Sequence, residues 1–188
     1  MPETDEGGSS VGVHDTVVPW MAVSLHAERH TRASEFTMLG PQLNFLVKRW
    51  NLPDGQGNLY TSAGAGTAIE NGETHFAAWT GFLADYETRR FYGSYELRLM
   101  YADRTEKAAW QRARVGVAPY LASYDQINLW LMVQVDRRDE QHAIGHSHGV
   151  LPPPMAVTPL VRLIYKTFLV EGGVSTRGKV MFNWVQQF

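Results

Sequence analysis

The sequence predicts an all-β fold: a closed, antiparallel, up-and-down transmembrane β-barrel of about ten strands, with about eight as the alternative. Three observations predict it. Apolar and polar side chains alternate with a period of two from residue 16 onward, as is typical of strands. No run approaches the ~20 apolar residues that a membrane-spanning helix needs. One face of successive strands carries charged residues, while the other mixes small, aliphatic and aromatic ones.

The clearest alternation lies between Phe91 and Tyr101, where Leu97 and Leu99 share one face and Glu96 and Arg98 the other. Similar runs between turn-like breaks predict ten strands, near 16–28, 34–49, 58–69, 74–86, 90–102, 107–120, 126–136, 155–165, 167–174 and 178–188. The connections fall on two alternating sides. The longest, 137–154, belongs to the side that is external in a bacterial barrel.

Composition sets limits on the class of protein. The chain has 188 residues, no cysteine and a formal net charge of −2. We expect a single barrel domain over 16–188 after a flexible, acidic N-terminal segment over 1–15. The lack of cysteine excludes disulfides and thiolate metal sites, and the charge gives no indication of a nucleic-acid partner. The first residues lack the features of a signal peptide, so we expect a mature or truncated form of an exported protein.

The charged face is expected to line a narrow interior. The residues predicted to form this charge network are Asp85, Glu96, Arg98, Arg112, Arg114, Asp136, Arg162, Lys166, Glu171 and Lys179. Two interpretations stay open. Acidic and basic groups that neutralise one another would fill the barrel, since unpaired buried charges are costly. Alternatively, a small conduit with a basic wall would attract anions.

Bulky and small residues are also expected to shape this interior. Trp110, Trp130, Tyr92 and Met132 lie on the polar faces and would fill it further. The Gly64-Ala65-Gly66 stretch within a predicted strand is expected to make room for bulky side chains of the neighbouring strand. A soluble antiparallel barrel alternates in the same way but turns its apolar face inward, and periodicity alone does not distinguish the two.

The C-terminal strand carries the most specific motif. It ends in an alternating aromatic pattern formed by Gly178, Val180, Phe182, Trp184 and Phe188. This pattern resembles the β-signal that closes bacterial outer-membrane proteins. The resemblance implies a location in the bacterial outer membrane, with the lipid bilayer and the barrel-assembly machinery as partners.

Further segments extend the resemblance over about residues 16–188. They include Lys48-Arg49-Trp50-Asn51-Leu52-Pro53-Asp54, Ala84-Asp85-Tyr86-Glu87, Ala113-Arg114-Val115-Gly116-Val117 and Thr158-Pro159-Leu160-Val161-Arg162. These blocks are similar to a family of small, uncharacterised proteobacterial outer-membrane β-barrels. The resemblance implies the fold and the location, and it implies no particular activity.

The 137–154 loop contains candidate metal ligands. His142, His146 and His148 are spaced so that a flexible loop could bind a divalent transition metal such as Cu²⁺, Ni²⁺ or Zn²⁺ weakly. The alternative is a solvated loop without a fixed site, because ligands without supporting contacts bind poorly. No other cofactor is indicated.

These observations favour a non-enzymatic outer-membrane barrel, either structural or a narrow pathway for a small solute or ion. A surface barrel that binds a metal or ligand through the 137–154 loop is one alternative. A soluble, lipocalin-like barrel with an internal ligand is another. The weakest is a hydrolase at the rim, built on His26 and Glu28 with His75 nearby, since these residues form the best acid–base cluster in the sequence.

Overall fold

The computed structural model describes residues 2–4, 8–31, 35–142 and 155–186. All regular secondary structure within these ranges is β-strand. Alternating side chains and frequent aromatic and β-branched residues account for this, because such residues pack well on a pleated surface. The twelve strands are β1 (Pro2–Thr4), β2 (Gly8–Val18), β3 (Met21–His30), β4 (Phe36–Leu52), β5 (Gly55–Glu70), β6 (Glu73–Thr88), β7 (Phe91–Ala102), β8 (Glu106–Val117), β9 (Asn128–His142), β10 (Ala156–Tyr165), β11 (Phe168–Val174) and β12 (Val180–Gln186).

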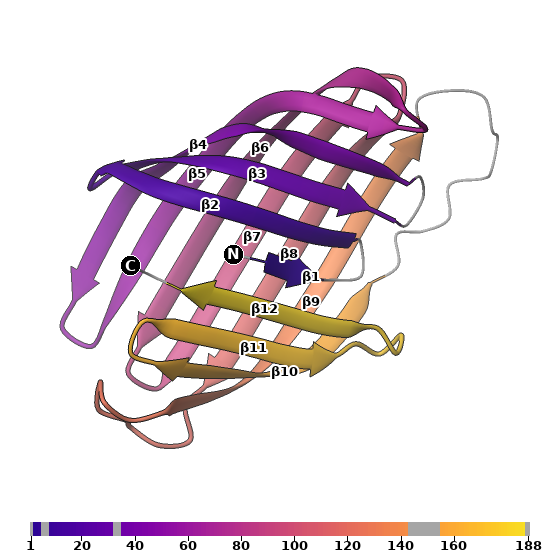
Figure 1. Ribbon diagram of the computed structural model, residues 1–188. Coiled ribbons are helices and arrows are strands. Elements are labelled where there is room, and N and C mark those ends of the chain that lie inside the picture. The colour runs from indigo at the N-terminus through magenta and orange to yellow at the C-terminus, as the bar shows by residue number, and fades with distance from the viewer. Residues whose placement is uncertain (1, 5–7, 32–34, 143–154, 187–188) are drawn as a thin grey trace.

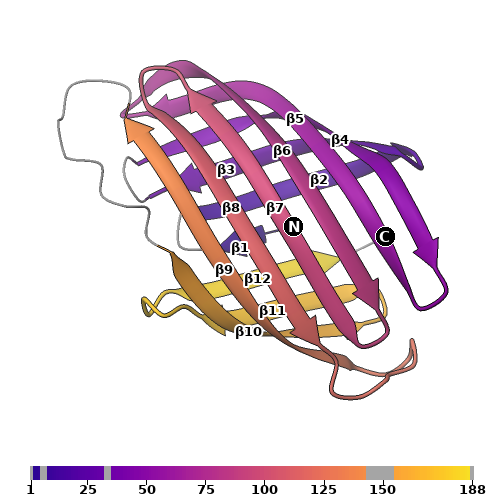
Figure 2. The ribbon, with the colours of Figure 1, turned by 180° about the vertical axis from the view of Figure 1, so that it is seen from behind.

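The strands form one antiparallel, up-and-down sheet that curls into a barrel-like shape (Figure 1). Each long strand pairs with its neighbours in sequence, and Figure 2 shows the same order from behind. Among the described residues, β2 and β12 do not pair with each other. The three-residue β1 lies between them and pairs with both. The antiparallel, up-and-down architecture is therefore confirmed. Among the described residues the two long edges meet only through Pro2–Thr4, so the predicted full closure is not confirmed.

The number of strands exceeds the predicted value of about ten. Eleven long strands and β1 are present in the described residues, because 8–18 forms β2 instead of a flexible segment. The expected strand at 16–28 is two strands, β2 and β3, joined by a turn at Pro19 and Trp20. The signal was weak here because the inward positions of β2 are Ser10, Gly12 and His14, residue types that do not favour strands.

The connections separate into two ends of the barrel, as expected from the alternating strands. One end, called the Asn71 end, carries the connections 31–35, 71–72, 103–105, 143–155 and 175–179. The other, called the Pro53 end, carries 19–20, 53–54, 89–90, 118–127 and 166–167. Asn71 and Gly72 both have positive φ, at 50° and 83°, as a tight two-residue hairpin between twisted strands requires.

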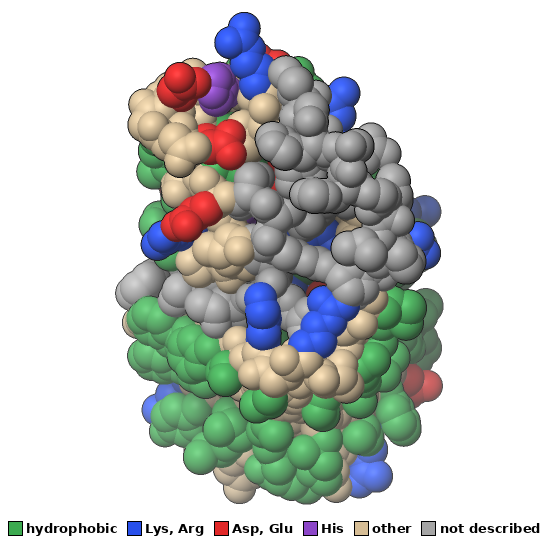
Figure 3. Space-filling model, turned by 90° about the vertical axis from the view of Figure 1, so that its right-hand side faces the viewer, with side chains coloured by type: hydrophobic (Ala, Val, Ile, Leu, Met, Phe, Trp, Pro, Cys, Tyr) green, Lys and Arg blue, Asp and Glu red, His purple; other side chains and the backbone are tan. Residues whose placement is uncertain are grey.

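The wall is apolar outside and polar or mixed inside. In β10, Val161 and Leu163 are exposed on the outer face, whereas Arg162 between them is buried. In β9, Leu131 is likewise exposed while Trp130 is almost fully covered. In the end view of Figure 3, hydrophobic side chains cover the lower flank. Among the described residues no helix is long and apolar enough to cross a membrane.

Two apolar clusters lie inside the barrel. The first, at the Asn71 end, consists of Phe36, Met38, Ala68, Ala77, Trp79, Met100, Ala102 and Ala108. The second reaches to the Pro53 end and consists of Ala118, Trp130, Met132, Leu160 and Met181, with Tyr92 and Ile164 packed against it. Tyr92, Trp130 and Met132 thus point inward, as predicted. Polar side chains lie among and between these clusters, and Arg162, for example, is directly opposite Trp130.

Gly64 has the expected steric role. A Cβ added at Gly64 would lie 2.3 Å from Cε2 of Trp79, its cross-strand partner on β6. The missing side chain therefore lets the Trp79 indole lie across β5. Gly66 instead allows a close approach to the backbone of Leu39 and Gly40 on β4.

Candidate functional site: the charged interior

Strand register places opposite charges directly across the ladders of β8–β11. Arg112 faces Asp136 across β8 and β9, and its Nε donates to Oδ1 at 2.9 Å. Arg162 faces Glu171 across β10 and β11, with Nε donating to Oε1 at 2.6 Å. Because directly opposed residues are the closest cross-strand neighbours, the register alone forms both pairs.

Glu171 joins several strands. Its side chain is fully buried, and besides Arg162 it accepts from Asn183 of β12 at 2.9 Å and from Arg114 of β8 at 3.4 Å. Arg114 also donates from Nε to Gln134, its cross-strand partner, at 2.7 Å. A buried carboxylate is costly unless it is paired and hydrogen-bonded, and Glu171 has both kinds of partner.

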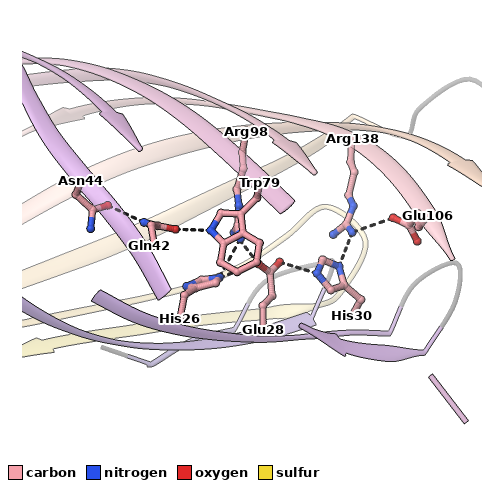
Figure 4. Close-up of polar contacts among 9 residues, drawn as sticks. All are labelled: His26, Glu28, His30, Gln42, Asn44, Trp79, Arg98, Glu106 and Arg138. Atoms are coloured by element: carbon pink, nitrogen blue, oxygen red, sulfur yellow. Dashed lines mark hydrogen bonds and ion pairs between the residues drawn. The ribbon is translucent and has the colours of Figure 1, made fainter. Parts of the chain in front are cut away.

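A second group of contacts crosses the interior between strands that share no ladder (Figure 4). Arg98 of β7 places Nη1 2.6 Å from Oε2 of Glu28 on β3, and its Nη2 lies 2.9 Å from Nε2 of His26. Glu28 also contacts His26 at 3.1 Å through Oε2 and His30 at 3.3 Å through Oε1. The two carboxylate oxygens therefore hold one arginine and two histidines.

Arg138 of β9 extends this group toward the Asn71 end. Its Nη2 lies 2.6 Å from Nδ1 of His30 and 3.4 Å from Oε1 of Glu106, which is almost fully buried (Figure 4). The His30 ring stacks on Phe36 with centroids 4.4 Å apart. His30 is thereby held between an apolar ring on one side and polar groups of two strands on the other.

A neutral chain of hydrogen bonds continues along β4. Trp79 donates from Nε1 to Oε1 of Gln42 at 2.6 Å, and Gln42 donates from Nε2 to Asn44 at 2.6 Å. Asn44 in turn donates to the Ser24 hydroxyl at 3.0 Å. The indole also lies 5.8 Å from the His26 ring, centroid to centroid, so this chain borders the charged group.

These side chains surround a cavity of about 380 Å³ inside the barrel. Four arginines line it, Arg98, Arg112, Arg114 and Arg138, together with the glutamates Glu28 and Glu96. The other polar lining residues are Ser10, His14, His26, His30, Gln42, Ser62, Ser94, Trp110 and Asn183. A volume of this size lies within the range of small-molecule sites.

Most of the charge network predicted from sequence lies in this interior. Asp85 accepts a hydrogen bond from the buried Asn58 at 2.8 Å, near the Pro53 end. Two residues are exceptions. Lys166 is exposed at the turn between β10 and β11, with its ammonium 5.2 Å from the centroid of the Tyr165 ring. Lys179 is exposed in the 175–179 turn. Both lie where a strand ends, so the alternation on which their prediction depended no longer applies.

The other candidate residues lie apart from the cavity. Val180, Phe182 and Trp184 share the exposed outer face of β12, Gly178 occupies the preceding turn with a φ of 76°, and Phe188 lies outside the described residues. His75 contacts Glu73 at 3.5 Å. It lies in the same row as Glu28, but β4 and β5 separate the two residues.

The metal prediction falls almost wholly outside the described residues. His146 and His148 are not described, and of His142 only the backbone is, at the end of β9. Within the described part of the chain no group of three or more acidic or histidine side chains is arranged to hold a metal ion. Metal binding by the 137–154 loop stays a prediction.

Three interior residues were not predicted from the sequence because they lie just beyond the ends of the predicted strands. His30 follows the predicted end at 28, Arg138 follows the end at 136, and Glu106 precedes the start at 107. Each continues the period of two from a residue already identified as inward, so longer strands would have included them. Gln42 and Trp79 lay within predicted strands, but an uncharged side chain gave no reason to single them out.

Comparison of the chain with protein-family models, with curated proteins and with solved structures finds no match.

Proposed function

We propose that this chain is a closed, transmembrane β-barrel of the bacterial outer membrane and acts without catalysis, as a barrel with a narrow polar interior. The observation that carries the proposal is the inverted polarity of the wall. Aliphatic and aromatic side chains are exposed around the outer face, while arginines and carboxylates are buried inside. Soluble monomers rarely expose large contiguous apolar surfaces, whereas a membrane barrel needs one.

The aromatic side chains add support. Many of those on the outer face lie near the Pro53 end: Trp20, Trp50, Tyr86, Phe91, Tyr120, Tyr165 and Phe168. Such side chains favour the boundary between hydrocarbon and water, because they have an apolar body and, in Trp and Tyr, a polar tip. Phe76 and Tyr101 are exposed near the Asn71 end. Aromatic residues at both ends of an apolar wall fit a bilayer-spanning barrel.

The contacts inside the barrel favour a narrow pathway or a structural role and argue against a wide pore. The five buried or half-buried arginines of the interior each lie within 3.4 Å of a carboxylate. Two apolar clusters occupy further space inside the barrel. A soluble lipocalin-like barrel would have an apolar interior and a polar outer face, the reverse of this arrangement. That contrast is why we prefer the membrane barrel.

We propose no hydrolase at the rim. Both oxygens of Glu28 already contact neighbouring groups, one shared by Arg98 and His26 and the other near His30. A carboxylate held by a guanidinium at 2.6 Å is better placed to maintain the interior than to remove a proton from a substrate.

Refolding into detergent, followed by gel electrophoresis in SDS with and without boiling, tests the proposal. A membrane barrel is expected to migrate differently when unboiled and to give a β-type circular dichroism spectrum only in detergent or lipid. Solubility without detergent, together with identical migration of both samples, would overturn the membrane assignment. Conductance in planar bilayers then separates the two remaining roles. Stable single-channel steps indicate a pathway, and their absence in an inserted barrel indicates a structural role.

A further inference from the structure

We infer that the interior cavity is a binding site for a small phosphate-bearing anion. This inference deepens the proposed function, since it rests on a barrel with a polar interior, but it does not require conduction. The central observation is an asymmetry of charge at the cavity wall. Among the side chains that the structure describes, four arginines and two glutamates line the cavity.

The carboxylates that pair with the remaining three arginines belong to the same barrel interior but do not line the cavity. Asp136, Glu106 and Glu171 are buried and are not among the residues that line the cavity. They contact Arg112, Arg138 and Arg114 respectively. The described charges of the interior thus nearly balance, which keeps the buried groups stable, while the described charges that line the cavity are mostly basic.

The basic side chains lie together because of strand register. Trp110 faces Arg98 on β7 and Arg138 on β9, so the three residues form one row across the wall. The next row holds Glu96, Arg112 and Asp136. Arg98 and Arg138 are the diagonal neighbours of Arg112 in these ladders. Diagonal neighbours lie ~7–8 Å apart, a distance that long side chains span, so their guanidinium groups can reach one ligand.

Phosphate suits such a wall better than a carboxylate does. Each guanidinium carries five N–H donors in a planar fork, and a phosphate presents more oxygen acceptors over a wider range of directions. Hydroxyls of Ser10, Ser62 and Ser94 also line the cavity and add neutral donors. The Trp110 indole lies under the Arg112 guanidinium, with the ring centroid 4.1 Å from Cζ, which restricts that side chain.

Phosphate chemistry has two natural sources for a membrane barrel, a free phosphate compound and a lipid headgroup. The test is calorimetric titration of the refolded chain in uncharged detergent. Inorganic phosphate is the soluble probe, short-chain phosphatidic acid is the lipid probe, and glycerol is the uncharged control. The parent chain is expected to bind at least one phosphate probe and not glycerol. Binding of inorganic phosphate points to a soluble ligand, and binding of phosphatidic acid alone points to a lipid headgroup.

Neighbouring residues of β9 supply a matched pair of variants. Arg138→Gln removes a guanidinium from the cavity wall, and Arg137→Gln removes one from the exposed face of the same strand. Affinity for phosphate is expected to fall at least about tenfold in Arg138→Gln, which is the effect of losing one charge-assisted hydrogen bond. It is expected to stay unchanged in Arg137→Gln. Equal affinity in both variants, or no binding of either phosphate probe by the parent chain, would overturn the inference.

A third variant distinguishes loss of the binding site from misfolding of the protein. Glu96→Gln removes a negative charge from the wall with little change of shape, so phosphate affinity is expected to rise several-fold. A damaged fold would lower affinity, not raise it, and an unchanged or lower affinity in this variant counts against the site. Heat-dependent migration on gels is measured for every variant. If the parent chain shows heat-dependent migration but binds neither phosphate probe, the cavity site alone is refuted. If the parent chain shows no heat-dependent migration, the membrane barrel itself is refuted.

Discussion

Arg98 and Glu28 form an ion pair of 2.6 Å across the interior, between β7 and β3, two strands that share no ladder. Backbone hydrogen bonds fix each strand only to its immediate neighbours. A contact of this kind instead connects two parts of the wall that are distant around the sheet. The side chains of this pair are 20% and 16% exposed, so solvent screens them less than it would a surface pair.

Breaking this pair from one side should destabilise the barrel. Arg98→Gln leaves the Glu28 carboxylate without its guanidinium partner, which we expect to cost about 3–5 kcal/mol in the free energy of unfolding. Urea titration of the refolded protein in lipid vesicles measures the loss. The double variant with Glu28→Gln should lose clearly less than the sum of the two single changes, because no lone charge remains.

The exposed pair of Arg137 and Asp139 is the control for this experiment. Its side chains are 52% and 39% exposed, and its separation is 3.4 Å. The median surface ion pair contributes about 0–1 kcal/mol, so Arg137→Gln should change stability little. Equal losses for Arg98→Gln and Arg137→Gln would mean that the cross-interior pair has no special role.

The alternation of side chains was enough to predict which residues share a face, and the structure confirms this for the charges of β7–β11. It was not enough to predict where strands end, because the period says nothing about the residue at which pairing stops. His30 and Arg138 were missed as interior residues because the predicted strands ended too early to include them. The cross-interior contacts of Arg98 could not be predicted at all, since they depend on how the sheet curls and not on any local pattern.

The N-terminal part shows a second limit. Val11, Val13 and Val17 are exposed on the outer face of β2, as in the other strands. The inward positions, however, are small or polar, and the acidic residues before them are typical of a flexible segment. Pairing with β3 and with β1 stabilises a strand that local propensity alone does not favour.

Gly64 should tolerate no side chain. In Gly64→Ala the new Cβ would meet the Trp79 indole at 2.3 Å, and that ring is held by its hydrogen bond to Gln42. We expect a loss of about 1–3 kcal/mol, which urea titration in vesicles would detect. Gly93→Ala is the matched control, because nothing lies within 4 Å of its added Cβ. If both variants unfold at the parent's urea concentration, Trp79 moves aside more easily than its contacts imply.

The outer face offers a test of the proposed bilayer. Val161 lies near the middle of β10, and Tyr165 lies at its end; both are exposed on the outer face. If lipid surrounds the barrel, Val161→Arg should cost about 2–4 kcal/mol in vesicles and Tyr165→Arg only about 0–1 kcal/mol. The comparison adds the same residue to the same strand at two different depths. A soluble barrel would accept arginine equally well at both positions.

The aromatic face of β12 should matter for assembly more than for stability. Phe182 and Trp184 are exposed on the outer face, so replacing both by Ala leaves the interior intact. If the assembly machinery reads these rings, the double variant should reach the outer membrane in strongly reduced amounts, measured by cell fractionation and heat-dependent migration. Its stability after refolding in vitro should fall only modestly.

The control is Phe168→Ala on the neighbouring β11, which removes a comparably exposed ring outside the C-terminal pattern. Equal amounts of control and double variant in the membrane would show that these rings are not recognised, and the resemblance to a β-signal would then carry no information about location.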